Sequence, residues 1–220
     1  MSARAEILER IREAIGPRGR DRQADYAAVP RGYRQTASLG EDECIELLAD
    51  RLTHYDAGVY RCDAATVRST VAQALAARGK RRLVVPVDLP PDWIPDTIDA
   101  VPDTNLSYAE LDRVDGVLTG CTLAIALTGT IVLSHAAGEG RRALTLIPDY
   151  HLCIIGADHV VETVPEAVRR IAALNPALVT TISGPSATAD IEMTRVRGVH
   201  GPRTLDVVLV QRPPGETAQT

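Results

Sequence analysis

A polar stretch rich in glycine and proline, residues 180–203, separates two apolar runs near the C-terminal end of the chain. The runs, residues 177–179 and 205–210, predict buried strands. A strand, a turn-rich polar segment and a second strand are the arrangement with which α/β proteins build ligand sites at strand ends. Residues 183–186 favour a short helix, because a serine cap is followed by proline, and free N–H groups there would suit an anion. The commoner role of such residues is a structural turn.

The composition predicts a folded domain with an aliphatic core. The chain has 220 residues, 45% of them hydrophobic, with no phenylalanine and one tryptophan, Trp93. Its net charge is −5, and no large basic face is evident beyond the N-terminal region. Nucleic acid is therefore not expected as the main partner, because phosphate neutralisation requires clustered cations.

The four cysteines are widely spaced and form no CxxC pair. The sequence therefore has no iron–sulfur or structural zinc signature, and we expect buried, reduced thiols and a cytoplasmic protein. No apolar run reaches membrane-spanning length, and residues 1–25 lack the apolar core of a signal peptide.

The N-terminal region has a different sequence pattern from the rest of the chain. Residues 2–15 predict a helix whose apolar stripe, Ile7, Leu8, Ile11 and Ile15, cannot be buried by the helix alone. The stripe could pack on its own domain or on another subunit, including a second copy of the chain. The predicted organisation is a helix and arginine-rich arm over residues 1–38, an α/β domain over 39–212 and a flexible tail over 213–220.

Between the arm and the tail, helical and strand patterns alternate, which predicts an α/β fold with a mixed, largely parallel sheet and flanking helices. The strands between residues 123 and 155 predict an antiparallel or mixed excursion. The expected helices span residues 40–51, 64–77, 106–113 and 162–174, and the expected strands span 58–62, 83–87, 116–119, 123–126, 130–133, 144–147 and 152–155.

Polar, glycine-rich segments at the strand ends are the candidates for binding a small anion. Residues 138–142 contain two glycines, which make the backbone flexible, and two adjacent arginines, whose guanidinium groups could bind an anion. The commoner role of such arginines is solvated surface charge. The sequence contains no GxGxxG, P-loop, HExxH or GxSxG motif, so no catalytic or metal-binding residue is assigned. His135, His151 and His200 could cluster, although the commoner role of each is that of a hydrogen-bonded structural or loop histidine. The candidate ligand-binding residues are Thr128, Gly129, Thr130, Gly138, Gly140, Arg141, Arg142, Ser183, Gly184, Ser186, Thr188, Asp190, His200 and Gly201.

Several linked motifs occur in one order along the C-terminal half of the chain. They are DGVLTG at 115–120, IALTGTIV at 125–132, GRRALTLIPD at 140–149, SGPSATADIE at 183–192 and GVHGPR at 198–203. Taken together, they resemble the LUD-domain family, and most closely its lactate utilization protein C branch.

The resemblance implies a fold similar to the superfamily of ribose-5-phosphate isomerase, glucosamine-6-phosphate deaminase and CoA-transferases. It also implies a subunit of a system that oxidises L-lactate to pyruvate, with iron–sulfur clusters in partner subunits and none in this chain. The sequence departs from the family pattern at Leu127, where an acidic residue commonly precedes Thr-Gly-Thr. That departure favours ligand binding over autonomous catalysis.

Two other functions remain open at the level of sequence. One is a stand-alone enzyme that acts on a sugar phosphate or a CoA ester. The other is a non-catalytic assembly or regulatory protein.

Overall fold

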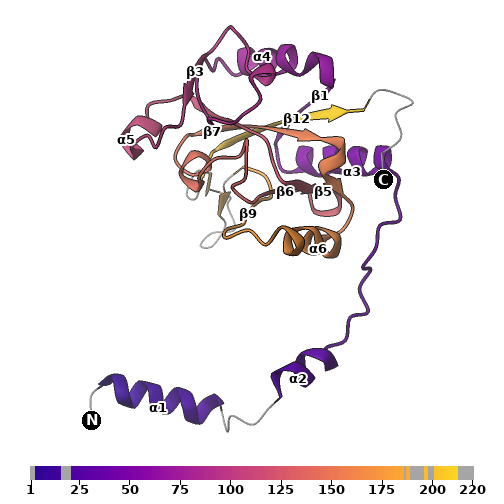
Figure 1. The fold of residues 1–220 in the computed structure, drawn as a ribbon, viewed down its shortest axis with the longest axis vertical. Coiled ribbons are helices and arrows are strands. Elements are labelled where there is room, and N and C mark those ends of the chain that lie inside the picture. Colours follow the sequence, from indigo (N-terminus) through magenta and orange to yellow (C-terminus); the bar gives the residue numbers. More distant parts are fainter. Residues whose placement is uncertain (1–2, 16–20, 186, 189–195, 198–200, 213–220) are drawn as a thin grey trace. The chain divides into compact units, whose positions relative to one another are not determined.

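The computed structural model describes residues 3–15, 21–185, 187–188, 196–197 and 201–212 (Figure 1). The chain divides into two compact units, Met1–Arg34 and Gln35–Thr220.

The N-terminal unit contains two helices, α1 (Ala3–Ile15) and α2 (Arg22–Ala28). Helix α1 agrees with the helix predicted over residues 2–15, and none of its described residues is buried; Ser2 lies outside the described residues. Helix α2 lies within the segment that was expected to be an arm without helices, so that expectation was wrong there. It begins because the carboxylate of Asp21 accepts hydrogen bonds from the N–H groups of Gln23 and Ala24, at 2.9 and 3.2 Å.

A six-stranded parallel sheet forms the centre of the larger unit and confirms the expected α/β class (Figure 1). Its strands carry the apolar runs of the sequence, as expected for parallel strands that are covered on both faces. Their spatial order is β1 (Gly58–Asp63), β12 (Thr204–Gln211), β7 (Tyr150–Gly156), β4 (Gly116–Thr119), β2 (Arg82–Val85) and β3 (Asp99–Pro102).

A second, four-stranded sheet is mixed. Strands β5 (Leu123–Ile125) and β6 (Thr130–Leu133) pair antiparallel, as expected for the strands at 123–126 and 130–133 in an antiparallel or mixed excursion. Strand β9 (Thr180–Ile182) pairs antiparallel with β6, and β8 (Val160–Val161) pairs parallel with β5. The predicted mixed sheet is therefore present. Strand β7, which was expected to belong to it, instead lies in the parallel sheet. A short antiparallel ladder joins β10 (Ala187–Thr188) to β11 (Val196–Arg197).

Two apolar cores cover the two faces of the parallel sheet. Helix α4 (Val67–Ala77) packs on one face, where it contacts residues such as Leu152 and Ile154. Helix α3 (Glu41–His54) and the second sheet pack on the other face, against residues such as Cys153 and Ile155. These strand residues alternate between the cores, as the two-residue period of a strand requires. Helix α6 (Val164–Leu174) covers the second sheet, and α5 (Tyr108–Leu111) is a single turn.

Three local predictions were wrong. The expected strand at 144–147 is instead a 3₁₀ turn, η4 (Arg142–Thr145), because the Arg142 side chain donates to the Thr145 carbonyl and folds the backbone back. A strand was expected at 177–179, but the strand in this region is β9, which begins one residue later, at Thr180. In place of the expected helix at 183–186, Gly184 and Pro185 form a bend, since Gly184 has φ 86°, which a right-handed helix does not allow; Ser186 lies outside the described residues.

Strand β3 was not predicted, because its segment is rich in proline. It lies at the edge of the sheet, where proline is tolerated.

Candidate functional site

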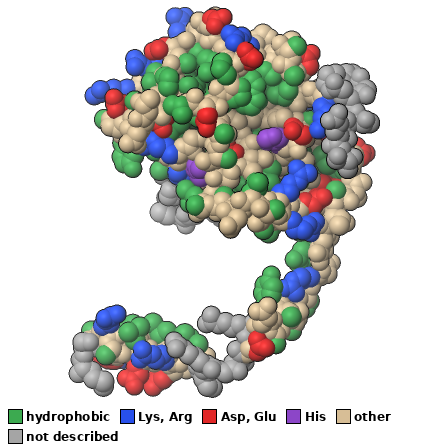
Figure 2. Space-filling model, in the orientation of Figure 1, with side chains coloured by type: hydrophobic (Ala, Val, Ile, Leu, Met, Phe, Trp, Pro, Cys, Tyr) green, Lys and Arg blue, Asp and Glu red, His purple; other side chains and the backbone are tan. Residues whose placement is uncertain are grey.

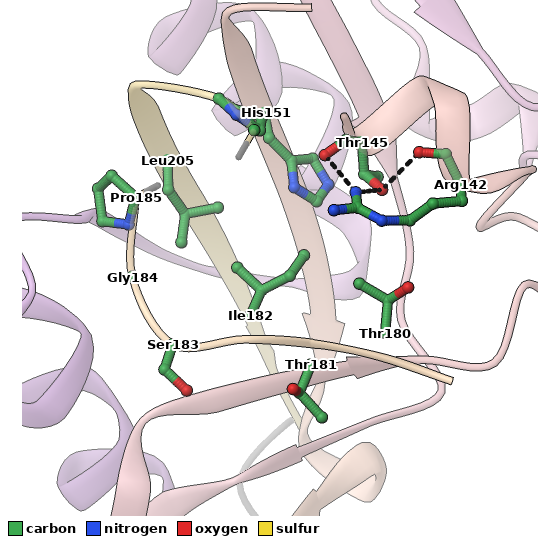
Figure 3. A pocket seen from close by; sticks show the side chains of 12 residues that line it. Arg142, Thr145, His151, Thr180, Thr181, Ile182, Ser183, Gly184, Pro185 and Leu205 are labelled. Atoms are coloured by element: carbon green, nitrogen blue, oxygen red, sulfur yellow. Dashed lines mark hydrogen bonds between the residues drawn. The ribbon is translucent and has the colours of Figure 1, made fainter. Parts of the chain in front are cut away.

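A pocket of about 230 Å³ lies at the edge of the parallel sheet where β7 and β12 begin, next to β9 (Figure 3). We name it the amino-edge pocket. Its walls come from η4, the starts of β7 and β12, and the strand and bend at 180–185. The lining residues are Arg142, Thr145, His151, Thr180, Thr181, Ile182, Ser183, Gly184, Pro185, Gly201, Pro202 and Leu205.

Arg142 supplies the positive charge of this pocket. Its guanidinium donates from Nη1 to the carbonyl oxygen of Thr145 at 2.8 Å and to Oγ1 of the same residue at 3.0 Å (Figure 3). No carboxylate lies within ion-pair distance of Arg142 in the part of the chain that the structure describes. Burial lowers the pKa of Arg142, but a guanidinium remains charged in proteins. The pocket therefore contains a half-buried cation whose charge the described side chains do not neutralise.

His151 lies on the same side of the pocket as Arg142 and Thr145 (Figure 3). Its Nε2 is 2.8 Å from Oγ1 of Thr119, and its side chain is buried. Burial and the neighbouring charge of Arg142 lower the pKa of His151 to about 4. The imidazole is consequently neutral at pH 7, so it can offer hydrogen bonds to a ligand but no second positive charge.

The facing wall is formed by β9 and the bend that follows it. Thr180 and Ile182 point toward Arg142 and His151, whereas Thr181 and Ser183 point to the other side of the strand (Figure 3). Thr180, Thr181 and Ser183 line the pocket (Figure 3). The Ser183 hydroxyl is 2.9 Å from Oγ1 of Thr130, which is itself 2.8 Å from Oγ1 of Thr128. Thr130 and Thr128 thus support the wall through Ser183, although neither residue lines the pocket.

Gly184 fixes the path of this wall. Its φ of 86° is unfavourable for other residues, and a Cβ atom there would lie 2.6 Å from Cβ of Tyr55, at the end of α3. Only glycine fits this bend without displacing α3.

His135 connects the glycine loop at 138–140 to the pocket wall. Its Nδ1 lies 2.8 Å from the carbonyl oxygen of Gly140, and its Nε2 lies 2.9 Å from Oγ1 of Thr180. The two hydrogen bonds hold the loop and β9 together beside the pocket.

Arg141 has a different role from Arg142, although the two are adjacent. Its guanidinium forms a two-pronged ion pair with Asp103, at 2.7 and 3.0 Å, and also donates to the carbonyl oxygen of Leu106. The guanidinium holds the pKa of Asp103 below its usual value. Arg141 does not line the amino-edge pocket, and its contacts tie the η4 turn to the loop before α5.

Two of the candidate glycines serve the backbone. Gly129 has φ 59°, and a Cβ atom there would lie 2.7 Å from Cβ of Arg51. Gly140 has φ 68°, and its Cβ would lie 2.9 Å from Cδ2 of Leu144. Gly138 lines a different pocket, at the opposite edge of the sheet.

The structure thus brings four candidate residues to the amino-edge pocket, namely Arg142, Ser183, Gly184 and Gly201. Thr188 lies in β10, and Ser186, Asp190 and His200 lie outside the described residues. Sequence reasoning missed His151, Thr145, Thr180 and Thr181 as members of the site. For His151 a usable signal was its position, because it is a polar residue at the start of the apolar strand β7.

Leu127, where the family pattern commonly has an acidic residue, does not line the amino-edge pocket. Its side chain is 43% exposed, and its N–H donates to the carbonyl oxygen of Glu162 at 3.1 Å. A carboxylate at this position would therefore lie on the surface rather than beside Arg142.

The described residues include no group of three or more histidine, cysteine or carboxylate side chains that could hold a metal ion. Among the described helices, none has the length and apolarity needed to cross a membrane.

Comparison with known proteins identifies the family. Residues 89–210 match the family described as LUD domain. The chain is 43% identical over 211 residues to lactate utilization protein C of Deinococcus radiodurans, which covers 94% of this chain and 95% of that protein. It is 27% identical over 225 residues to lactate utilization protein C of Exiguobacterium sp., with 94% and 95% of the two chains covered.

A solved structure agrees with this result. The crystal structure of a DUF162 family protein from Deinococcus radiodurans matches with a TM-score of 0.69 and 41% identity, over 79% of this chain and 99% of that chain. On these similarities, the chain belongs to the LUD-domain family.

Proposed function

We propose that this protein acts in lactate utilization, as a subunit of a system that oxidises L-lactate to pyruvate, and that its amino-edge pocket binds a small carboxylate such as lactate. Two relatives that match almost the whole chain are named lactate utilization protein C, which supports the pathway. The observation that carries the site assignment is Arg142, a half-buried guanidinium that faces a pocket and has no carboxylate partner among the described residues.

The chemistry of the pocket suits a small hydroxy acid. A planar guanidinium pairs well with a carboxylate, because its N–H groups match the two carboxylate oxygens. The hydroxyl of Thr180, which faces Arg142, can donate to or accept from the hydroxyl group of the ligand (Figure 3). At about 230 Å³ the cavity is smaller than typical drug-sized sites, which measure about 300–1,000 Å³, so it fits a ligand of few atoms.

Oxidation of L-lactate to pyruvate breaks one C–H and one O–H bond and releases two electrons and two protons. The side chains around the amino-edge pocket are not electron acceptors. We therefore assign electron acceptance to iron–sulfur clusters in partner proteins, and assign binding and orientation of the carboxylate to this chain.

Helix α1 is the candidate contact with such a partner. Its apolar stripe, formed by Ile7, Leu8, Ile11 and Ile15, is exposed, with 71% of Ile15 accessible. Figure 2 shows hydrophobic side chains, in green, on the surface of this helix. A helix of 13 residues is marginally stable alone and gains stability when its apolar face is covered. Deletion of residues 1–34 should release the partner proteins and leave the domain folded, as measured by co-purification and circular dichroism.

The experiment that tests the function is an anaerobic pull-down of the tagged full-length protein from cells grown on lactate. The eluate is assayed for iron, for its visible spectrum and for lactate-dependent dye reduction. Arg142→Gln should keep the partners and lose most of the activity. Arg113→Gln, which removes a charge from an exposed site outside the pocket, should keep both. A colourless wild-type eluate without lactate oxidation would contradict the proposal.

A further inference from the structure

A second pocket, of about 440 Å³, lies at the opposite edge of the parallel sheet, where β4, β7 and β12 end. We name it the carboxyl-edge pocket, and the residues that matter here are Ala64, Asp88, Trp93, Gly120, Gly138 and Asp158. The crevice beyond the carboxyl ends of parallel strands is where open α/β sheets usually bind ligands. None of the residues that line the amino-edge pocket lines this one.

One side of the carboxyl-edge pocket combines an indole with bare backbone. The N–H of Gly120 donates to the carbonyl oxygen of Gly138 at 2.8 Å, which closes the loop over the end of β4. A Cβ atom on Gly120 would lie 3.4 Å from the ring of Trp93. The half-buried indole therefore packs directly on peptide backbone and presents a flat apolar surface beside it.

The carboxylates of Asp88 and Asp158 line this pocket, together with the imidazole of His159. Asp88 accepts a hydrogen bond from the N–H of Gly138 at 2.9 Å, which leaves its other oxygen for a ligand. Asp158 lies 3.7 Å from Nε2 of His159, whose Nδ1 is 2.8 Å from the carbonyl oxygen of Cys121. No lysine or arginine is among the residues that line the pocket. An anion would consequently meet two carboxylates and no fixed cation.

We propose that the carboxyl-edge pocket binds a neutral or cationic planar heteroaromatic molecule, with its ring against Trp93 and its N–H groups directed at Asp88 and Asp158. The cavity volume falls within the range of about 300–1,000 Å³ that is typical of small-molecule sites. Base–aromatic stacking and a cation near an indole face are both favourable, and a nearby carboxylate adds to the attraction for a cationic ring.

The chain provides its own reporter, because Trp93 is its one tryptophan and lines this pocket rather than the amino-edge pocket. The full-length protein is titrated with adenosine, with the methylnicotinamide cation and with benzoate, and tryptophan fluorescence is recorded. We expect saturable changes with adenosine and methylnicotinamide, and none with benzoate. Saturation by benzoate, or no saturation by either of the other two at millimolar concentration, would overturn the proposal.

Two substitutions in one 3₁₀ turn, η1 (Ala64–Thr66), make a matched pair. Ala64 lines the pocket and Ala65 does not, and both are exposed. Ala64→Leu should weaken binding of both planar probes at least tenfold, whereas Ala65→Leu should leave it unchanged. Asp88→Asn should weaken the cationic probe more than adenosine. Equal binding by Ala64→Leu and wild type would show that the probes bind elsewhere.

Discussion

The two pockets lie at opposite edges of one parallel sheet and have opposite electrostatic character. The amino-edge pocket has the guanidinium of Arg142 and the hydroxyl of Thr180, whereas the carboxyl-edge pocket has Trp93 and the carboxylates of Asp88 and Asp158. The strands between them are apolar and buried. The charge of each pocket is therefore set by the turns and loops beyond the strand ends, which supply Arg142 at one edge and Asp88 and Asp158 at the other.

The largest expected effect is the loss of stability when a glycine of either pocket is replaced by alanine. Gly184 and Gly138 both have positive φ, at 86° and 75°, but a Cβ atom at Gly184 meets Tyr55 at 2.6 Å, while the nearest atom at Gly138 is 3.8 Å away. Gly184→Ala should lower the free energy of unfolding by about 2–5 kcal/mol, the sum of left-handed backbone strain and overpacking. Gly138→Ala should cost only the strain, about 1–2 kcal/mol. Urea denaturation of both variants measures the difference, and equal losses would contradict the crowding at Tyr55.

The next effect concerns His151, whose pKa falls from 6.5 to about 4 on folding because the ring is buried near Arg142. Between these values the unfolded chain binds more protons than the folded chain, so stability rises with pH. This residue should therefore contribute a loss of about 3 kcal/mol as the pH falls from 6.5 to 4. In His151→Gln that part of the pH dependence should disappear. A slope identical to wild type would show that folding does not shift the pKa of His151.

The third effect distinguishes Arg142, which we expect to bind the ligand, from Arg141, which we expect to stabilise the fold. L-Lactate at one hundred times its dissociation constant should stabilise the wild type by about 2.7 kcal/mol, and Arg142→Gln should lose nearly all of it. Arg141→Gln should keep the ligand effect but lower the free energy of unfolding by about 1–3 kcal/mol, because Asp103 is left largely buried without its partner. Denaturation with and without lactate measures both quantities, and a reversal of the two phenotypes would refute the assignment.

The smallest effect is expected at Leu127. Its side chain is 43% exposed and outside both pockets, so Leu127→Glu should change stability by less than about 0.5 kcal/mol. It should also leave the lactate-induced stabilisation unaltered, as thermal denaturation would show. A large gain in lactate affinity would mean that the carboxylate common in the family reaches the ligand after all.

The fold was largely predictable because its strands are continuous apolar runs and its helices have apolar stripes. Elements that depend on other signals were missed. Helix α2 is specified by the Asp21 cap rather than by periodicity, and β3 is a proline-containing edge strand. The η4 turn was mistaken for part of a strand because Leu144, Leu146 and Ile147 form a short apolar run in the sequence.

The candidate site was predictable only in part. Residues 138–142 and 183–186 were recognised as polar loops at strand ends, but the two arginines could not be distinguished from the sequence. Their difference depends on Asp103, which lies 38 positions before Arg141 in the chain and neutralises it. His151 was overlooked as a site residue because only the parallel register of β7 and β12 places it beside the loop that carries Gly201.

The most direct test of the central claim is a calorimetric titration of L-lactate into the full-length wild-type protein and into Arg142→Gln. We expect saturable binding at one site in the wild type, at least a tenfold loss of affinity in the variant, and no change in Arg113→Gln. Equal affinity in the wild type and Arg142→Gln, or no binding of lactate or pyruvate to the wild type, would contradict the assignment of the amino-edge pocket as a carboxylate site.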